Sequence, residues 1–102
     1  MSELAEVVLD EKIENTTREP NKYNVIFMND DATPMDWVVH VLTTIFKHNT
    51  AAAQELTMKI HHHGSAVVGT YHYEIAEQKA AETMVSSREN GFPLKVTIEE
   101  QT

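Results

Sequence analysis

The chain has 102 residues, a formal net charge of −8 and no cysteine. This length favours one domain with a modest core, and the 41% of hydrophobic residues is typical of a globular protein. The missing cysteine excludes disulfides, thiol catalysis and thiolate metal sites. The chain has neither an apolar run of ~18 residues nor a cluster of Lys and Arg, so the sequence argues against a membrane span and against nucleic-acid binding. We expect a cytoplasmic protein.

The first part of the chain differs in composition from the rest. Residues 1–20 contain six acids against two bases, so they lack the basic start of a signal peptide. Their charge and their few large apolar side chains predict a flexible N-terminal extension over residues 1–21. The core domain is then expected over residues 22–102.

The first half of this domain reads as a strand followed by two helices. Residues 23–28 are a strand with apolar side chains on both faces, which indicates a position inside a sheet. Thr33 is the expected N-cap of a helix, with Pro34 in the first helical position and Asp36 completing an approximate capping box. A second helix is predicted from Asn49 or Thr50 to the neighbourhood of Gly64, which suits a helix C-terminus.

The second half alternates strand, helix and strand. Residues 66–71 form a short apolar strand, and residues 73–89 carry apolar side chains at helical spacing until Asn90 and Gly91 interrupt them. Residues 94–99 alternate as a strand with one buried face does. The order β-α-α-β-α-β predicts an α+β fold, with a small three-stranded antiparallel sheet packed against three helices.

A polar run stands at the end of the first strand. Asn29, Asp30 and Asp31 follow apolar residues directly, and desolvated carboxylates are costly unless they have a partner. Oxygens of Asn29 and Asp31, with a neutral His61 as third acceptor, would satisfy the three N–H donors of a primary ammonium. An apolar pocket is expected beside them, lined by Met35, Ile60 and Leu94. Such a site suits a free peptide N-terminus.

The run His61-His62-His63 supports an alternative: a metal-binding or metal-dependent hydrolytic domain that uses this cluster with Asp30 or Asp31. Adjacent helical residues point about 100° apart, so one metal ion does not easily collect all three. The sequence contains no nucleophile in a recognised context, no phosphate-binding glycine loop and no cofactor motif. We therefore expect neither an enzyme nor a bound cofactor or metal.

Four motifs in the same order resemble the ClpS adaptor family. They are the stretch 23–35, which contains Asn29-Asp30-Asp31-Ala32-Thr33-Pro34-Met35; Ile60-His61 followed by Gly64; the segment 69–79; and Pro93-Leu94. The resemblance runs in register from about residue 23 to residue 100. Three positions depart from the usual pattern of the family: Thr57 stands where Met is usual, Ala32 where an aromatic residue is common, and Gln78 where Thr is.

The resemblance implies an N-end rule adaptor. Such a protein binds substrates whose first residue is Leu, Phe, Tyr or Trp and delivers them to a AAA+ unfoldase, ClpA or ClpC, for degradation by ClpP. By motif position, Asn29, Asp31 and His61 would bind the substrate α-amino group. The residues that would shape the pocket for the first side chain are Asp30, Thr33, Met35, Thr57, Ile60 and Leu94.

The resemblance also implies where the partner binds. Glu74 and Lys79 match positions that contact the N-terminal domain of the unfoldase, and the N-terminal extension would engage the unfoldase during delivery. We expect the adaptor to be a monomer. Thr57 lies four residues before His61, hence on the same helix face, where a shorter and polar side chain would reshape the pocket.

Overall fold

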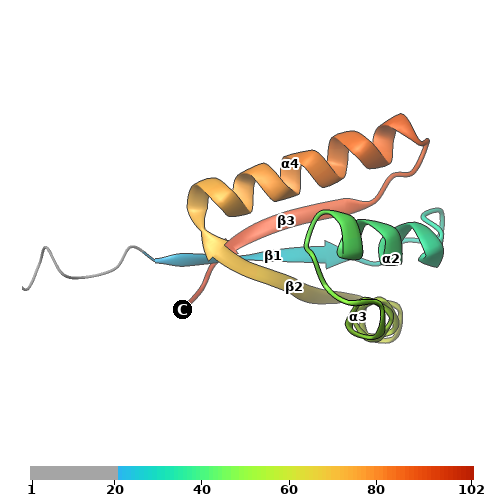
Figure 1. The fold of residues 1–102 in the computed structure, drawn as a ribbon, viewed down its shortest axis with the longest axis horizontal. Coiled ribbons are helices and arrows are strands. Elements are labelled where there is room, and N and C mark those ends of the chain that lie inside the picture. Colours follow the sequence, from blue (N-terminus) through green and yellow to red (C-terminus); the bar gives the residue numbers. More distant parts are fainter. Residues whose placement is uncertain (1–20) are drawn as a thin grey trace, which may run out of the picture.

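The computed structural model describes residues 21–102 and contains three strands and three helices (Figure 1). Along the chain they are β1 (Lys22–Met28), α2 (Met35–Thr44), α3 (Thr50–His63), β2 (Ser65–His72), α4 (Tyr73–Glu89) and β3 (Lys95–Glu100). The predicted order β-α-α-β-α-β is confirmed. Except for Asn21, the predicted N-terminal extension lies outside the described residues. None of the helices within residues 21–102 is long and apolar enough to cross a membrane.

The three strands form an antiparallel sheet in the order β2-β1-β3, so β1 is internal, as predicted. Its pairing with β2 shifts between Val25 and Ile26, because Val25 lies opposite Gly69 while Ile26 lies opposite Val67. Val68 is the extra residue of this β-bulge. Its carbonyl oxygen lies 2.7 Å from Nε2 of His48, so the loop between α2 and α3 is tied to the bulge.

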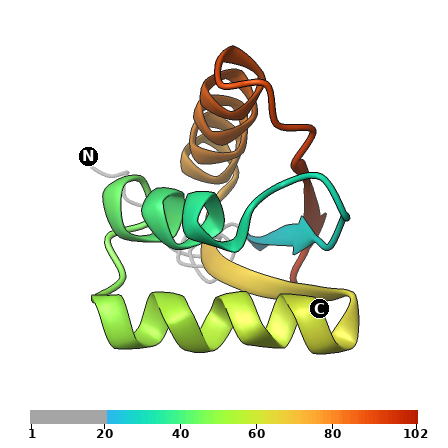
Figure 2. The same ribbon diagram turned by 90° about the vertical axis from the view of Figure 1, so that its right-hand side faces the viewer.

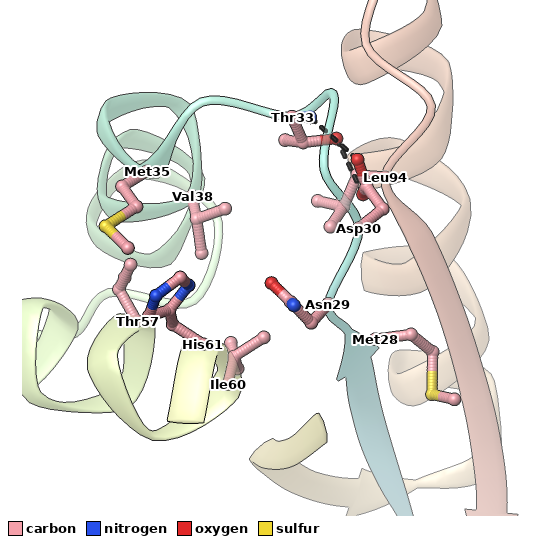
Figure 3. A pocket seen from close by; sticks show the side chains of 10 residues that line it. All are labelled: Met28, Asn29, Asp30, Thr33, Met35, Val38, Thr57, Ile60, His61 and Leu94. Carbon is pink, nitrogen blue, oxygen red and sulfur yellow. Dashed lines mark hydrogen bonds between the residues drawn. The ribbon is translucent and has the colours of Figure 1, made fainter. Parts of the chain in front are cut away.

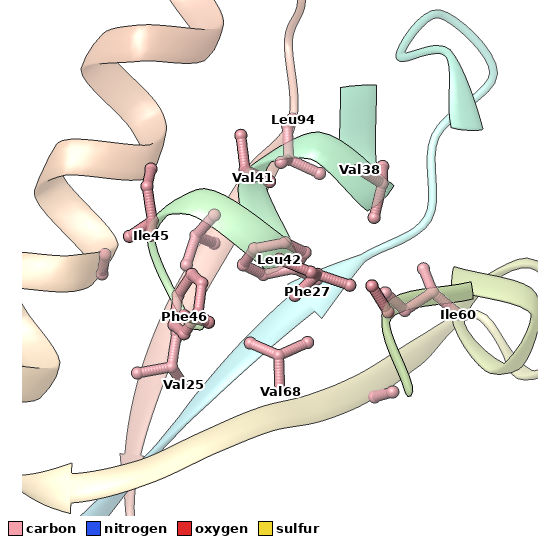
Figure 4. Packing of buried hydrophobic residues seen from close by; sticks show 14 of the residues in the cluster. Val25, Phe27, Val38, Val41, Leu42, Ile45, Phe46, Ile60, Val68 and Leu94 are labelled. Carbon is pink, nitrogen blue, oxygen red and sulfur yellow. The ribbon is translucent and has the colours of Figure 1, made fainter. Parts of the chain in front are cut away.

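One face of the sheet carries the hydrophobic core, and the helices cover it. Val25 and Phe27, on alternate positions of β1, are completely buried in a cluster to which all three helices and Phe46 contribute (Figure 4). Helix α2 lies between α3 and α4 (Figures 1 and 2). The end of β1 therefore reaches the place where α2 and α3 meet, which positions the site described below.

Helix α4 buries polar side chains as well as apolar ones. Thr83 and Ser87 are fully buried, and their hydroxyls donate to the carbonyl oxygens of Lys79 and Thr83, at 2.8 and 2.7 Å. The indole Nε1 of Trp37 in α2 donates to Oγ of Ser87 at 2.8 Å. Every one of these buried polar groups thus has a partner, which removes the cost of burying it.

The start of α2 corrects the sequence prediction. Thr33 is not the N-cap: α2 begins at Met35, Pro34 occupies the cap position, and no side chain caps the helix. Oγ1 of Thr33 donates instead to Oδ2 of Asp30 at 2.8 Å, and the backbone N–H of Thr33 donates to Oδ1 at 2.7 Å. The carboxylate of Asp30 therefore holds Thr33 in the preceding turn.

The caps of α3 agree with the prediction. The side chain of Asn49 accepts from the backbone N–H of Ala52 at 2.8 Å, which satisfies one free donor of the first turn. Gly64 closes the helix with φ of 89°, a left-handed conformation that glycine adopts without strain. Because α3 ends there, His61 lies in its last turn, beside the end of β1.

Candidate functional site

A pocket lies at the end of β1, between α2, α3 and the segment that precedes β3 (Figure 3). Its volume is about 290 Å³ when the part open to solvent is included. Because the enclosed part is smaller than this, the pocket suits one side chain better than a whole cofactor. Its lining residues are Met28, Asn29, Asp30, Thr33, Met35, Val38, Thr57, Ile60, His61 and Leu94.

The walls of the pocket are mostly apolar. Ile60 and Leu94 are buried, whereas Met35, at the first position of α2, keeps 41% of its surface exposed. Met28 and Val38 also line the pocket, and the sequence analysis did not select them. Val38 was detectable, because it follows Met35 by three residues and therefore shares its helix face. The pocket thus offers a mainly apolar surface with a flexible methionine side chain at its edge.

Thr57 lies in this wall as a buried polar residue. Only 4% of its surface is exposed, and its hydroxyl donates to the carbonyl oxygen of Ala53 at 2.7 Å. The hydroxyl hydrogen is therefore bound within α3 and needs no partner in the pocket. Thr57 and His61, which the sequence predicts to share a helix face, both line the pocket.

Two polar side chains stand at the mouth of the pocket. Asn29 follows β1 directly, and its backbone N–H donates to the carbonyl oxygen of Gly64 at 2.9 Å, which fixes it beside the end of α3. His61 is exposed in the last turn of α3. In Figure 3 the carboxamide of Asn29 and the ring of His61 face the same opening. The structure thus brings together two of the three residues predicted to bind an ammonium group.

The two adjacent aspartates have different surroundings. Asp31 is exposed and does not line the pocket itself. Oδ1 of Asp30 accepts from the backbone N–H groups of Ala32, at 2.8 Å, and Thr33. Partial burial raises the pKa of Asp30. The hydrogen bonds from Thr33 and Ala32 and the nearby charge of Arg88 lower the pKa by more than burial raises it, so the pKa lies below the ordinary value. Asp30 is therefore an anion that organises the turn between β1 and α2.

The two residues predicted to contact an unfoldase lie on α4 in different environments. Glu74 is exposed in the first turn. Lys79 is half-buried: its Nζ donates to the carbonyl oxygen of Ile45 at 2.8 Å and lies 5.8 and 5.5 Å from the ring centroids of Phe46 and Tyr71. The ammonium of Lys79 is already bound inside the domain. A contact of these residues with a partner stays a prediction.

The histidine cluster gives no support to the metal hypothesis. Within residues 21–102 no group of three or more His, Asp or Glu side chains is arranged to hold a metal ion. The rings of His61 and His62 lie 5.3 Å apart, edge to face. All three histidines fall in the last turn of α3, where the helix dipole favours positive charge.

Comparison with known proteins gives a consistent result. Residues 18–97 match the family described as "ATP-dependent Clp protease adaptor protein ClpS". The chain is 40% identical over 90 residues to an ATP-dependent Clp protease adapter protein ClpS 2 of Bradyrhizobium diazoefficiens, a match that covers 88% of this chain and 82% of the relative. It is 42% identical to the ClpS adapter of Vibrio atlanticus, over 88% of this chain and 85% of the relative.

A solved structure agrees in fold as well as in sequence. The structure of Agrobacterium tumefaciens ClpS2 bound to L-phenylalaninamide superimposes with a TM-score of 0.79 and 38% sequence identity. The match covers 81% of this chain and all of the other. The ligand of that protein is a single amino-acid derivative with a free amino group and an aromatic side chain.

Proposed function

Because this chain belongs to the ClpS family of Clp protease adaptor proteins, we propose that it binds the free N-terminus of substrate proteins at the end of β1. It then delivers them to a ClpA- or ClpC-type AAA+ unfoldase for degradation by ClpP. The family comprises adaptors and not enzymes, which confirms that expectation from the sequence. The substrates are proteins whose first residue is Leu, Phe, Tyr or Trp.

One observation carries this proposal: a polar mouth lies directly above an apolar pocket of side-chain size. Asn29 and His61 stand at the mouth, and Ile60 and Leu94 form the buried walls below. The N-terminal residue of a substrate is complementary to this arrangement, because its α-ammonium and its side chain are attached to the same carbon atom. The L-phenylalaninamide bound to the A. tumefaciens relative has this chemistry.

The α-ammonium has three N–H donors. We assign as their acceptors the side-chain oxygen of Asn29, a carboxylate oxygen of Asp31 and a neutral ring nitrogen of His61. These bonds are charge-assisted and therefore stronger than neutral ones. Asp31 is exposed just outside the pocket, so it would contribute from the side of the opening rather than from within.

The first side chain enters the apolar pocket. Burial of one large side chain contributes about 2–3 kcal/mol, which makes this contact a main source of affinity. Met35 borders the pocket at the start of α2, and a substrate residue branched at its β-carbon would place an extra methyl group at this mouth. We expect Val and Ile to be rejected on steric grounds.

Delivery requires a second surface. We assign it to α4, where Glu74 offers an exposed carboxylate in the first turn. Lys79 would take part either by leaving its internal contacts or by holding the helix in place through them. We further expect a monomeric, cytoplasmic adaptor whose N-terminal extension, outside the described residues, engages the unfoldase.

The experiment that tests binding is fluorescence anisotropy with labelled peptides that differ only in the first residue. Peptides that begin with Leu, Phe, Tyr or Trp should bind, and those that begin with Val or Ile should not. Asn29→Ala and His61→Ala should weaken binding, whereas His63→Ala, which alters the same histidine run away from the pocket, serves as the matched control. Equal affinity for Phe and Val peptides would contradict the assignment of the pocket.

A further inference from the structure

Arg88 binds the backbone of the segment that carries one wall of the pocket. It lies in the last turn of α4, and its Nη1 donates to the carbonyl oxygens of Leu94 at 2.8 Å and Phe92 at 3.2 Å. Leu94 is 1% exposed and lines the pocket. Arg88 therefore does not line the pocket but binds the main chain of Leu94, which does.

The position of Leu94 makes this contact important. The pairing of β3 with β1 ends at Lys95, which lies opposite Met28. The carbonyl of Leu94 comes just before that ladder, where no strand partner on β1 is paired with it. Arg88 supplies a donor at this point, so the hydrogen-bonded frame of the sheet continues by one residue into the pocket wall.

Arg88 also acts on the turn after β1, which lies beside Leu94 on the same side of the pocket (Figure 3). Its positive charge lies near enough to Asp30 to favour the ionised carboxylate there. Asp30 in turn holds Thr33 through its hydroxyl and its backbone N–H. The charge of Arg88 thus favours the ionised form of the residue that organises the turn after β1, while its Nη1 binds the segment before β3.

The end of α4, which carries Arg88, is held in place by the residues that follow it. The backbone N–H of Phe92 donates to the carbonyl oxygen of Ser87 at 2.8 Å, and the rings of Phe92 and Trp37 lie 5.4 Å apart. Gly91 makes the reversal possible with a φ of 82°. Because the end of α4 is held on α2, a hydrogen bond from Arg88 fixes the position of Leu94 relative to both helices.

We propose that Arg88 is a positioning residue for substrate recognition, which holds Leu94 in the wall of the pocket for the first side chain. This inference rests on the proposed function. Both carbonyls are bound by the single atom Nη1, so the role requires a cationic donor near Leu94 and not the two-pronged geometry of a guanidinium. Lysine, with three donors on one nitrogen, should therefore retain most of the function.

The test compares Arg88→Met, which keeps the apolar stem, with Arg88→Lys. We measure the affinity of each for a Phe-initiated and a Leu-initiated peptide by anisotropy. Arg88→Met should lose about tenfold in affinity, the effect of one ordinary hydrogen bond, and Arg88→Lys should stay within about threefold of the wild type. Lys95→Met removes an exposed cation next to Leu94 and is the control for charge. Val96→Ala, in the core, is the control for general destabilisation.

Each result of these binding measurements either supports or overturns the positioning role of Arg88. Weakened binding by Arg88→Met, with rescue by Arg88→Lys and little change in both controls, supports the proposal. It is overturned if Arg88→Met binds as the wild type does, if Val96→Ala loses as much affinity, or if lysine fails to rescue.

A second measurement does not depend on peptide binding. In the free protein, Arg88→Met should shift the NMR signals of the Leu94 methyl groups and the Thr33 amide, and Lys95→Met should not. If the wild type binds none of the peptides, the proposed function fails, while this measurement still decides whether Arg88 positions Leu94. Unchanged Leu94 signals in Arg88→Met would overturn the positioning role.

Discussion

Thr57 in α3 and Thr83 in α4 are buried in the same way. Each donates its hydroxyl to the carbonyl oxygen four residues earlier, at 2.7 and 2.8 Å. Their surroundings differ: Thr57 lines the pocket at the end of β1, whereas Thr83 is fully enclosed in the interior under α4. When the hydroxyl of a threonine is bound by its own helix, the side chain presents only its small size to its neighbours. Beside Thr57 this small size leaves room for a ligand, whereas around Thr83 it allows close packing.

The contrast extends to the regions around these residues. The pocket region exposes Met35, Asn29 and His61, and all three line the pocket. The α4 region joins Trp37 and Ser87 by a hydrogen bond, and the side chains of Thr83 and Ser87 are fully buried there. Changes in the first region should therefore alter binding, and changes in the second should alter stability.

The largest expected effect comes from enlarging Thr83. Thr83→Met forces a longer side chain into a site with no exposed surface and should lower the free energy of unfolding by about 1–3 kcal/mol. Thr57→Met, its matched counterpart, should cost less than about 1 kcal/mol, because the pocket accepts the added atoms. Urea denaturation of both variants measures the difference. Equal losses would contradict the contrast between the two regions.

In a binding assay the order of the two variants should be reversed, with Thr57→Met showing the larger effect. Thr57→Met narrows the pocket and should reduce the affinity for a Trp-initiated peptide about tenfold relative to a Leu-initiated one, which corresponds to ~1.4 kcal/mol. Thr57→Val, with nearly the same shape and no hydroxyl, should leave this ratio unchanged, because the hydroxyl is bound to Ala53. Thr83→Met should not alter it either. A changed ratio in Thr57→Val would show that the hydroxyl itself contacts the substrate.

A smaller effect is expected from the hydrogen bond that joins α2 to α4. Ser87→Ala leaves the indole N–H of Trp37 without its acceptor and should cost about 1 kcal/mol in stability. Affinity for a Phe-initiated peptide should remain close to that of the wild type. Thermal unfolding together with anisotropy distinguishes the two properties. A loss of affinity without a loss of stability would place this bond in the binding machinery.

The smallest effect concerns acid. The folded-state pKa of Asp30 lies below its ordinary value of 3.8, so its ionisation stabilises the fold above that pH. This contribution is lost as the pH falls through the folded-state pKa. Asp30→Asn should therefore be less stable than the wild type at pH 7, and the difference should shrink at low pH. Glu82→Gln, which removes an exposed acid of α4, is the control for the loss of one negative charge.

Much of the fold was predictable because the signals are local. Helical periodicity and the caps Asn49 and Gly64 placed α3, and the alternation of residues 94–99 indicated a strand with one buried face. Thr33 misled, because its propensity as a cap does not reveal that Asp30 binds both its hydroxyl and its N–H. Whether Thr33 binds the first turn of the helix or the carboxylate of Asp30 depends on the backbone conformation of the turn.

The candidate site was predictable only in part. Side-chain chemistry and motif resemblance together selected Asn29, His61 and Leu94, which the structure brings to one pocket. It also selected Asp31, which lies outside the lining, since neighbouring residues in a turn differ in direction. Arg88 carried no signal, because its partner carbonyls reach it only through the reversal at Gly91.

The central claim is that the mouth of the pocket reads a free α-ammonium. The most direct test is the affinity of one Phe-initiated peptide measured with a free and with an acetylated N-terminus. Acetylation removes the charge and two of the three donors, so we predict that binding falls more than about a hundredfold, the equivalent of ~2.7 kcal/mol. Equal affinity for the two peptides would contradict the account.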